Sequence, residues 1–283
     1  MRWLLFLLPA FFGLSLPAEE NPVVPGKRSV IRFSESPVQS SDPVQVRYRI
    51  MAAENPGDYD VTKEAFEILL PEDWNPRDPY GLFIWIGAGD SPRIPKEWDK
   101  VLAKHRLIYI GAQNSGNKRN IFDRIRMAID ANHNLRQRYR IDGRRVYVSG
   151  FSGGSRVASM LGVAWGDMFS GTICCMGANF YTDVAAPDGK VYGLNYLPGE
   201  QLLPLVKQAC RYSLISAEND FNLANTRGVY KNGFVKEGFQ HVQFFEVPGL
   251  GHKMPPAGWL EKAIQFVDQG KEWQASAENP NVK

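Results

Sequence analysis

The stretch Arg145-Val146-Tyr147-Val148-Ser149-Gly150-Phe151-Ser152-Gly153-Gly154 is the most informative part of this sequence. Its first five residues have the character of a buried strand, and residues 156–161 have the character of a helix. Ser152 is therefore expected at a strand-to-helix turn, where the neighbouring glycines allow the backbone to bend sharply and pack closely. A serine held in this way is typical of a catalytic nucleophile.

Strands and helices alternate on both sides of this turn. An alternating pattern predicts a half-buried strand at 44–50, and a second strand is expected at 65–70. Apolar runs predict buried strands at 82–86, 107–110, 173–176, 212–216 and 242–247. Helical spacing and chain length predict helices at 96–104, 121–139, 201–209, 223–236 and 257–269. The order predicts the α/β class, with a doubly wound, mostly parallel sheet and helices on both faces.

The 283 residues are expected to form one main domain over 44–273. Residues 19–43 are predicted to be an extended N-terminal segment, and 274–283 a flexible C-terminal tail. Turn residues between 180 and 198 indicate an insertion over the site. The small net charge of +3, without a basic run that contains aromatic residues, argues against a nucleic-acid partner. The sequence does not determine the oligomeric state.

The first 18 residues have the features of a signal peptide. Met1-Arg2 gives a positive start, residues 3–16 are apolar, and Leu16-Pro17-Ala18 resembles a cleavage site. The apolar stretch is short for a membrane span, although an uncleaved anchor is the alternative. We therefore expect a secreted or periplasmic protein that has no membrane contact after cleavage.

Three cysteines, Cys174, Cys175 and Cys210, leave at least one free thiol. The first two lie in an apolar run, which favours buried, inert thiols. A disulfide from either of them to Cys210 remains open. We expect no metal site, since no histidine accompanies the cysteines at ligand spacing.

A nucleophilic serine needs a base within hydrogen-bond reach and an anion that orients the base. Of the four histidines, only His252 follows a predicted strand at the carboxyl edge, where catalytic groups of such sheets gather. For the acid we choose Asp220, which follows the strand at 212–216, with Glu218 as the alternative. The order Ser152, Asp220, His252 is that of one particular hydrolase fold.

A developing oxyanion requires N–H donors at fixed positions. The backbone of Gly153, directly after the nucleophile, is expected to give one donor. Ala88, in the loop after the strand at 82–86, is expected to give the other, with Gly87 as the next choice. The aromatic side chains predicted to line the substrate pocket are Phe151, Phe180, Tyr181 and Phe221, of which Phe151 and Phe221 are the chosen substrate-binding residues.

Together these segments resemble the α/β-hydrolase superfamily, and within it the exported branch of poly(3-hydroxybutyrate) depolymerases, feruloyl esterases and acetylxylan esterases. The resemblance covers roughly residues 60–270, and rests on residues 66–74, 140–154 and Gly249-Leu250-Gly251-His252. The chain departs from these relatives in the oxyanion loop, where Ile86-Gly87-Ala88-Gly89 replaces a His-Gly sequence.

The resemblance implies an exported serine esterase that works through a Ser-His-Asp triad and an acyl-enzyme intermediate. Such an enzyme needs no cofactor, and its partner is a small-molecule or polysaccharide-linked ester. The alternatives are a peptidase or thioesterase with the same triad, or a binding protein that kept the fold without catalysis.

Overall fold

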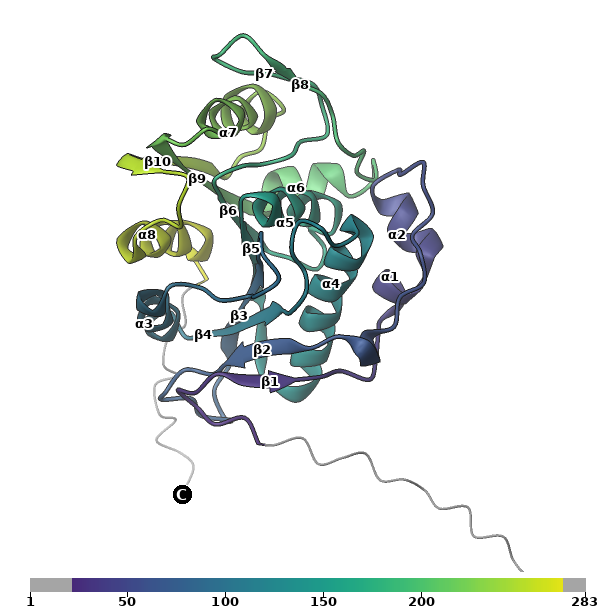
Figure 1. The fold of residues 1–283 in the computed structure, drawn as a ribbon, viewed down its shortest axis with the longest axis vertical. Helices are drawn as coiled ribbons and strands as arrows, with labels where there is room; N and C mark the ends of the chain where they lie inside the picture. The colour runs from purple at the N-terminus through teal and green to yellow at the C-terminus, as the bar shows by residue number, and fades with distance from the viewer. Residues whose placement is uncertain (1–21, 272–283) are drawn as a thin grey trace, which may run out of the picture.

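Eight strands form one sheet in the computed structural model, which describes residues 22–271 (Figure 1). The neighbouring strands β4, β3, β5, β6, β9 and β10 pair in parallel, whereas β1 and β2 run antiparallel to their neighbours. The predicted mostly parallel sheet is confirmed. In spatial order the strands are β1 (Ser29–Ile31), β2 (Phe66–Leu69), β4 (Leu107–Ala112), β3 (Tyr80–Ile86), β5 (Ile141–Phe151), β6 (Gly171–Cys175), β9 (Arg211–Asn219) and β10 (Val242–Gly251). The predicted signal peptide and the tail at 274–283 lie outside the described residues.

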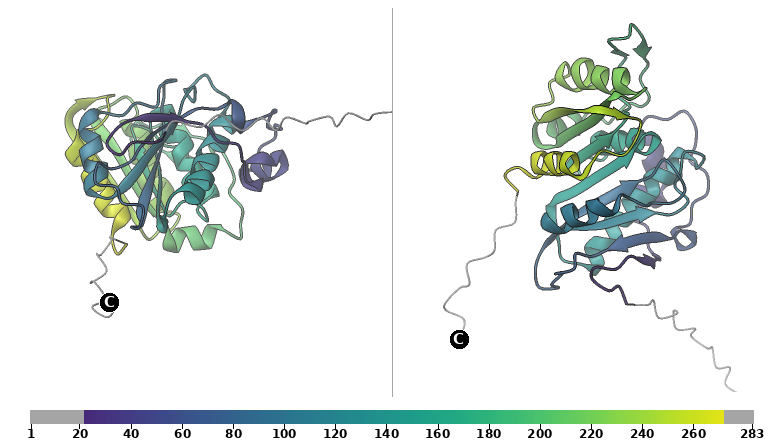
Figure 2. Two further views of the ribbon diagram at one scale, coloured as in Figure 1. Left: turned by 90° about the horizontal axis from the view of Figure 1, so that it is seen from below. Right: turned by 60° about the vertical axis from the view of Figure 1, so that its left-hand side comes forward.

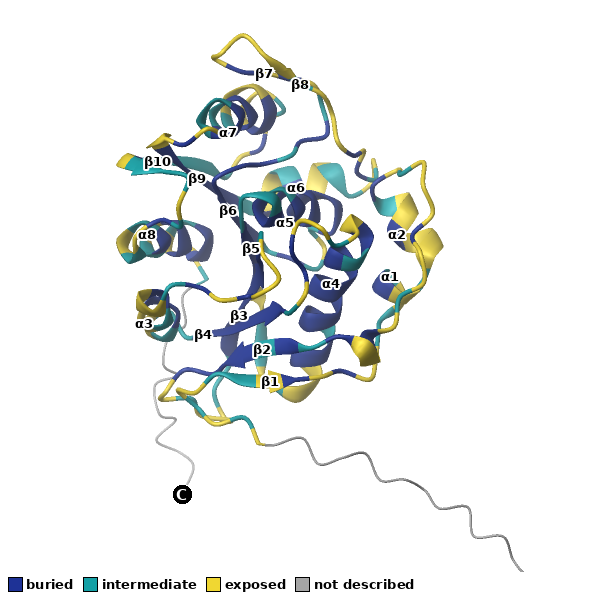
Figure 3. Ribbon diagram, in the orientation of Figure 1, coloured by how far each residue is buried: buried dark blue, intermediate teal, exposed yellow. Residues whose placement is uncertain are grey.

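Helices cover both faces of this sheet, as expected (Figure 2). One face carries α3 (Lys96–Lys104) and α8 (Ala257–Asp268), and the other carries α4 (Ile121–Arg138) and α5 (Gly153–Ala164). Alternate side chains of β3 point to the two faces, so Phe83 and Trp85 belong to one apolar cluster while their neighbours belong to the other. The central strands are therefore buried on both sides (Figure 3).

β3 and β5 lie side by side, although β4 comes between them in the sequence. The chain passes from β3 to β4 on one side and then returns to β5 on the other. In such sheets, the carboxyl ends of the strands at this kind of reversal are the usual place for a ligand. There Ile86 at the end of β3 pairs with Gly150 of β5. The loop after β3 therefore meets the turn after β5.

The predicted strand at 44–50 is wrong, because these residues lie in helix α2 (Pro43–Arg49). Asp42 caps the helix, since its carboxylate accepts a backbone N–H of the first turn at 2.8 Å, and proline is favourable at the first helical position. The buried residues Val46 and Ile50 are four positions apart, which is the spacing of one helix face. The other two apolar side chains of the alternating pattern, Val44 and Tyr48, are exposed, so the pattern does not mark the buried face of a strand.

Two further segments contain more structure than the sequence indicated. In the segment predicted as extended, β1 pairs with β2, and a short helix α1 (Val38–Ser41) packs against α4. The insertion contains a hairpin of β7 (Val184–Ala185) and β8 (Val191–Tyr192), which lies beside the helical segment after β9 (Figure 1).

The helices predicted at 201–209 and 223–236 also differ in detail. The first begins at Leu203, as α6 (Leu203–Ala209). The second divides into α7 (Leu223–Gly228) and a π-helical segment η2 (Val229–Val235). A Cβ on Gly228, at the junction, would lie 3.2 Å from Ala186 of the hairpin, so the hairpin packs closely where the helix type changes. Among residues 22–271, no helix combines the length and apolar character needed to cross a membrane.

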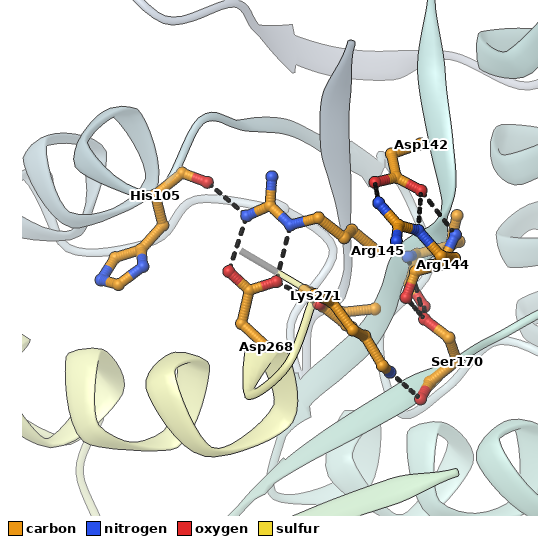
Figure 4. Close-up of polar contacts among 9 residues, drawn as sticks. His105, Asp142, Arg144, Arg145, Ser170, Asp268 and Lys271 are labelled. Atoms are coloured by element: carbon orange, nitrogen blue, oxygen red, sulfur yellow. Dashed lines mark hydrogen bonds and ion pairs between the residues drawn. The ribbon is translucent and has the colours of Figure 1, made fainter. Parts of the chain in front are cut away.

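A buried ion pair ties the end of α8 to the start of β5 (Figure 4). Arg145 Nε and Nη2 donate to the two carboxylate oxygens of Asp268 at 2.6 and 2.8 Å, and Nη2 also donates to the His105 carbonyl at 2.7 Å. Tyr147 donates its hydroxyl to the same carboxylate. Burial and the charge of Asp268 raise the pKa of Tyr147, which keeps the phenol protonated.

The three cysteines are buried as free thiols, which agrees with the favoured interpretation. Cys174 and Cys175 lie on β6, and Cys210 directly precedes β9. Burial raises the pKa of Cys174 to about 12, so this thiol stays protonated at neutral pH.

Candidate active site

Ser152 occupies the turn between β5 and α5 with φ 54° and ψ −117°, a conformation that costs a non-glycine residue about 1–3 kcal/mol. Its backbone N–H donates to the Cys175 carbonyl at 2.8 Å. Two glycines make the turn possible. A Cβ at Gly150 would lie 2.4 Å from the Gly154 carbonyl carbon, and one at Gly154 would lie 1.9 Å from the Ile86 oxygen. The turn predicted from the sequence is therefore present, and it packs directly on the loop after β3.

The predicted serine, histidine and aspartate come together in space. His252 Nε2 lies 2.9 Å from Ser152 Oγ, and His252 Nδ1 lies 2.7 Å from Asp220 Oδ1. The Asp220 side chain is fully buried and also accepts hydrogen bonds from the Ser216 hydroxyl and the Asn222 N–H, both at 3.0 Å. Each group therefore has the partner that a nucleophile, base and acid would need.

The neighbouring strands β9 and β10 bring the acid and the base together. Gly251 pairs with Asn219, after an irregularity in the β10 register, so the residues that follow these two lie side by side. Glu218, the alternative acid, does not reach His252 by any hydrogen bond in the described part of the chain. Its Oε2 accepts the Gly249 N–H at 2.7 Å, and it therefore fixes the loop that carries His252.

Two aromatic rings flank the imidazole of His252. The ring centroid of Phe221 lies 4.0 Å from it and that of Phe151 lies 4.9 Å from it. Phe221 is 74% exposed, which leaves it free to contact a bound molecule. Phe180 and Tyr181, in contrast, are buried and pack against each other with tilted rings. Of the four predicted pocket aromatics, only the chosen pair borders the histidine.

The predicted oxyanion donors, Gly153 and Ala88, lie on the two segments that meet here. Gly153 is the first residue of α5, where a helix leaves its N–H groups unpaired. Asn117 connects the segments, because its N–H donates to the Ala88 carbonyl at 2.9 Å and its side chain covers Gly153. A Cβ on Gly153 would lie 2.0 Å from Asn117 Oδ1, so only glycine leaves room for that amide.

Arg124 on α4 makes a hydrogen bond to the loop after β3. It is 6% exposed, and its Nη2 donates to the Gly87 carbonyl at 2.9 Å. Burial lowers its pKa to about 10, and no carboxylate among residues 22–271 is paired with it. In a trans peptide the C=O and the next N–H point in opposite directions. By holding the Gly87 carbonyl, Arg124 therefore turns the Ala88 N–H away from α4.

The sequence reasoning missed Asn117 and Arg124. Asn117 lies in a loop and gives no local signal. Arg124 does give one, because it is a charged residue next to Ile125 on the buried face of an amphipathic helix. The remaining histidines lie elsewhere, His105 after α3, His133 on α4 and His241 before β10. Within residues 22–271, no group of three or more possible metal-ligating side chains is found.

Solved structures share this architecture at low sequence identity, whereas no protein-family model and no curated protein matches the sequence. A fluorophosphonate-binding serine hydrolase of Staphylococcus aureus, with substrate bound, superimposes with a TM-score of 0.57 and 13% identity over 86% of this chain and 98% of that chain. A mutant of the feruloyl esterase module from Clostridium thermocellum, complexed with sinapinate, gives 0.56 and 12% over 92% and 95%. The chain has the α/β-hydrolase fold.

One of the matching structures belongs to a much longer chain. A putative dipeptidyl aminopeptidase IV from Bacteroides ovatus matches with a TM-score of 0.53 and 12% identity over 85% of this chain. The chain spans only 35% of the length of that protein. At these identities the likeness concerns the fold, and the chemistry must be argued from the residues at the carboxyl edge of the sheet.

Proposed function

We propose that this protein is a serine hydrolase that cleaves carboxylic esters, with Ser152 as nucleophile, His252 as general base and Asp220 as the orienting acid. The observation that carries the proposal is the pair of contacts on one imidazole, 2.9 Å to the serine oxygen and 2.7 Å to the buried carboxylate. A histidine with these two partners can accept the serine proton at one nitrogen while the other stays protonated and bonded to the acid.

The proposed reaction has two halves. Ser152 Oγ attacks the ester carbonyl as His252 removes its proton, and the N–H groups of Gly153 and Ala88 hold the oxyanion. The tetrahedral intermediate collapses, and His252 gives the proton to the leaving alcohol, which leaves an acyl-serine. Water, deprotonated by the same histidine, then attacks the acyl group. The second tetrahedral intermediate then collapses, which releases the carboxylic acid and returns the proton to Ser152.

Several structural neighbours support an ester as the substrate. Among them are the feruloyl esterase module with sinapinate and a ferulic acid esterase. The exposed Phe221 beside His252 offers an apolar surface to an acyl or alcohol group. We propose a small-molecule or polysaccharide-linked ester, and a protein that the signal peptide directs out of the cytoplasm. The dipeptidyl aminopeptidase-like neighbour makes peptide cleavage the second candidate, which amide substrates would test.

Labelling with a fluorophosphonate and turnover of a short-chain nitrophenyl ester test the nucleophile. The wild-type protein should react with the probe, and Ser152→Ala should lose both the label and the turnover because no other hydroxyl contacts His252 among the described residues. Ser155→Ala is the matched control, since Ser155 lies one turn further along α5 and its hydroxyl donates to the Gly177 carbonyl instead of contacting His252. It should keep the label. Retained turnover in a folded Ser152→Ala protein would reject the assignment, and an inert wild type would favour a binding protein.

A further inference from the structure

A second feature of the structure is a cavity of about 230 Å³, which is lined by Arg156 of the helix that follows the proposed nucleophile. Four parts of the chain enclose it: α5, the loop after β6, the β7–β8 hairpin with the residues that follow it, and the helical segment of α7 and η2. Polar atoms make up most of its exposed lining, although apolar residues such as Phe180 and Val229 also border it. The polar lining residues are Arg156, Thr182, Tyr192, Asn195 and Asn225.

Arg156 is the only charged residue of that lining. Its guanidinium makes three hydrogen bonds, all to neutral oxygens: the Ala178 carbonyl at 3.2 Å and the side-chain oxygens of Asn179 and Asn222 at 3.1 Å. Nε makes none of them. A guanidinium has five N–H donors, so its hydrogen-bonding capacity is not used up by the protein.

No carboxylate in residues 22–271 lies within ion-pair distance of Arg156. Burial lowers its pKa, and the carboxylate that acts on it, Asp220, does so across Asn222. Asp183, near the hairpin, is exposed and accepts the Leu194 N–H at 3.0 Å. A partly desolvated cation that faces a cavity without an anionic partner favours an anionic ligand.

Arg156, which lines the cavity, follows Ser152 by four positions at the start of α5. The Arg156 backbone N–H donates to the Ser152 carbonyl at 3.1 Å, and Gly177 lies near both the arginine side chain and the nucleophile turn. A Cβ on Gly177 would stand 3.5 Å from both Arg156 Nε and the Ser152 oxygen. A group bound at Nε would therefore lie close to the turn that carries Ser152.

We propose that this cavity is a carboxylate-binding subsite, and that the preferred substrate is an ester that also carries a free carboxylate, such as the half-ester of a dicarboxylic acid. The planar guanidinium would bind the carboxylate through Nε and a free Nη2 donor, while the ester carbonyl lies at Ser152. This inference rests on the proposed function, because it names the substrate class of the same serine.

Arg156 has a structural contact that an experiment must separate from recognition. It donates to Asn222, whose backbone N–H in turn donates to Asp220. A purely positioning role through Asn222 would change the reactivity of the triad toward every ester by the same factor. Recognition of a carboxylate would change the ratio between a charged and a neutral ester.

Monoethyl succinate and ethyl valerate provide that ratio, because they share the alcohol and differ in the terminal carboxylate. Acid release should show that the wild type has a higher kcat/KM for monoethyl succinate. Arg156→Gln should lower this preference about tenfold to a hundredfold, the usual range for a charged hydrogen bond. Arg144→Gln, exposed at the other end of β5, should leave the ratio unchanged. Equal losses for both esters in Arg156→Gln would overturn the subsite.

Binding measured without turnover separates this inference from the proposed function. Calorimetry with the Ser152→Ala variant should detect monoethyl succinate, and the double variant with Arg156→Gln should not. If the wild type cleaves ethyl valerate but Ser152→Ala binds no half-ester, the subsite is wrong and the esterase proposal stands. If the half-ester binds through Arg156 but the wild type cleaves neither ester, the esterase proposal is wrong and the subsite stands.

Discussion

At the scale of single residues, two carboxylates near the end of β9 differ in burial and in their hydrogen-bond partners. Asp220 is buried and receives hydrogen bonds from His252, Ser216 and Asn222. Glu218 is exposed and receives the Gly249 N–H, so it acts on the loop and not on the imidazole. The sequence alone left both open, because both follow the same strand. Their burial and their partners separate them.

Replacement of each carboxylate by its amide tests this difference. Asp220→Asn should lower kcat by about 10⁴-fold, because the amide would favour the wrong histidine tautomer. Glu218→Gln keeps an acceptor for Gly249 and should lower kcat by less than about tenfold, within the range of one lost hydrogen bond. Steady-state kinetics with a nitrophenyl ester gives both values. A larger loss in Glu218→Gln than in Asp220→Asn would assign the acid to Glu218 instead.

At the scale of elements, the loop after β3 depends on α4. Arg124 donates to the Gly87 carbonyl from the buried face of that helix, and through this peptide it sets the direction of the Ala88 N–H. Its charge has no carboxylate partner in residues 22–271, and its guanidinium donates to the loop whose Ala88 N–H would meet the oxyanion of the substrate. We infer that a helix remote from the substrate positions one donor of the oxyanion site.

Arg124→Met should therefore lower kcat by about 10²-fold, as does loss of one oxyanion donor, with a much smaller change in KM. Arg124→Lys, which keeps a donor and the charge, should recover part of the loss. Arg126→Met is the matched control, since Arg126 is buried on the same helix but donates to the Gly57 carbonyl. Should both methionine variants lose kcat equally, the effect would belong to the stability of α4 and not to the loop.

The elements also show how far the sequence predicts the structure. Long apolar runs predicted β3, β4 and the other central strands, because strands buried on both faces are mostly apolar. The interpretation of residues 44–50 failed because exposed Val44 and Tyr48 imitate strand alternation in a helix with one buried face. Ser152, Asp220 and His252 could be proposed from the sequence because their positions follow strand ends. Asn117 was not, since its contact with Gly153 depends on tertiary packing.

At the scale of the whole molecule, the Arg145–Asp268 ion pair joins two distant parts of the chain (Figure 4). It connects the helix after the final strand to the start of β5, which leads to the nucleophile turn. Both side chains are at least 97% buried, so neither charge can be hydrated if the other is removed. The pair is therefore costly to break from one side.

Asp268→Asn should lower the free energy of unfolding by about 3–5 kcal/mol, because it leaves the Arg145 charge buried without a counter-charge. Chemical unfolding followed by circular dichroism measures the change. Asp142→Asn, which affects the exposed pair with Arg144 on the same strand, should have little effect. If the two variants unfold at the same denaturant concentration, the buried pair does not hold α8 to the sheet. Tyr147→Phe, which loses one hydrogen bond to Asp268, should cost about 1–2 kcal/mol.

The three groups of the site come from the ends of β5, β9 and β10, and Ser152 precedes His252 by 100 residues. During synthesis on the ribosome, the serine is thus made long before its base. A nascent chain that has reached β6 carries a hydroxyl with no imidazole beside it. On the proposed function, hydrolysis begins only when the last strand has joined the edge of the sheet, so an unfinished chain cannot damage esters around it.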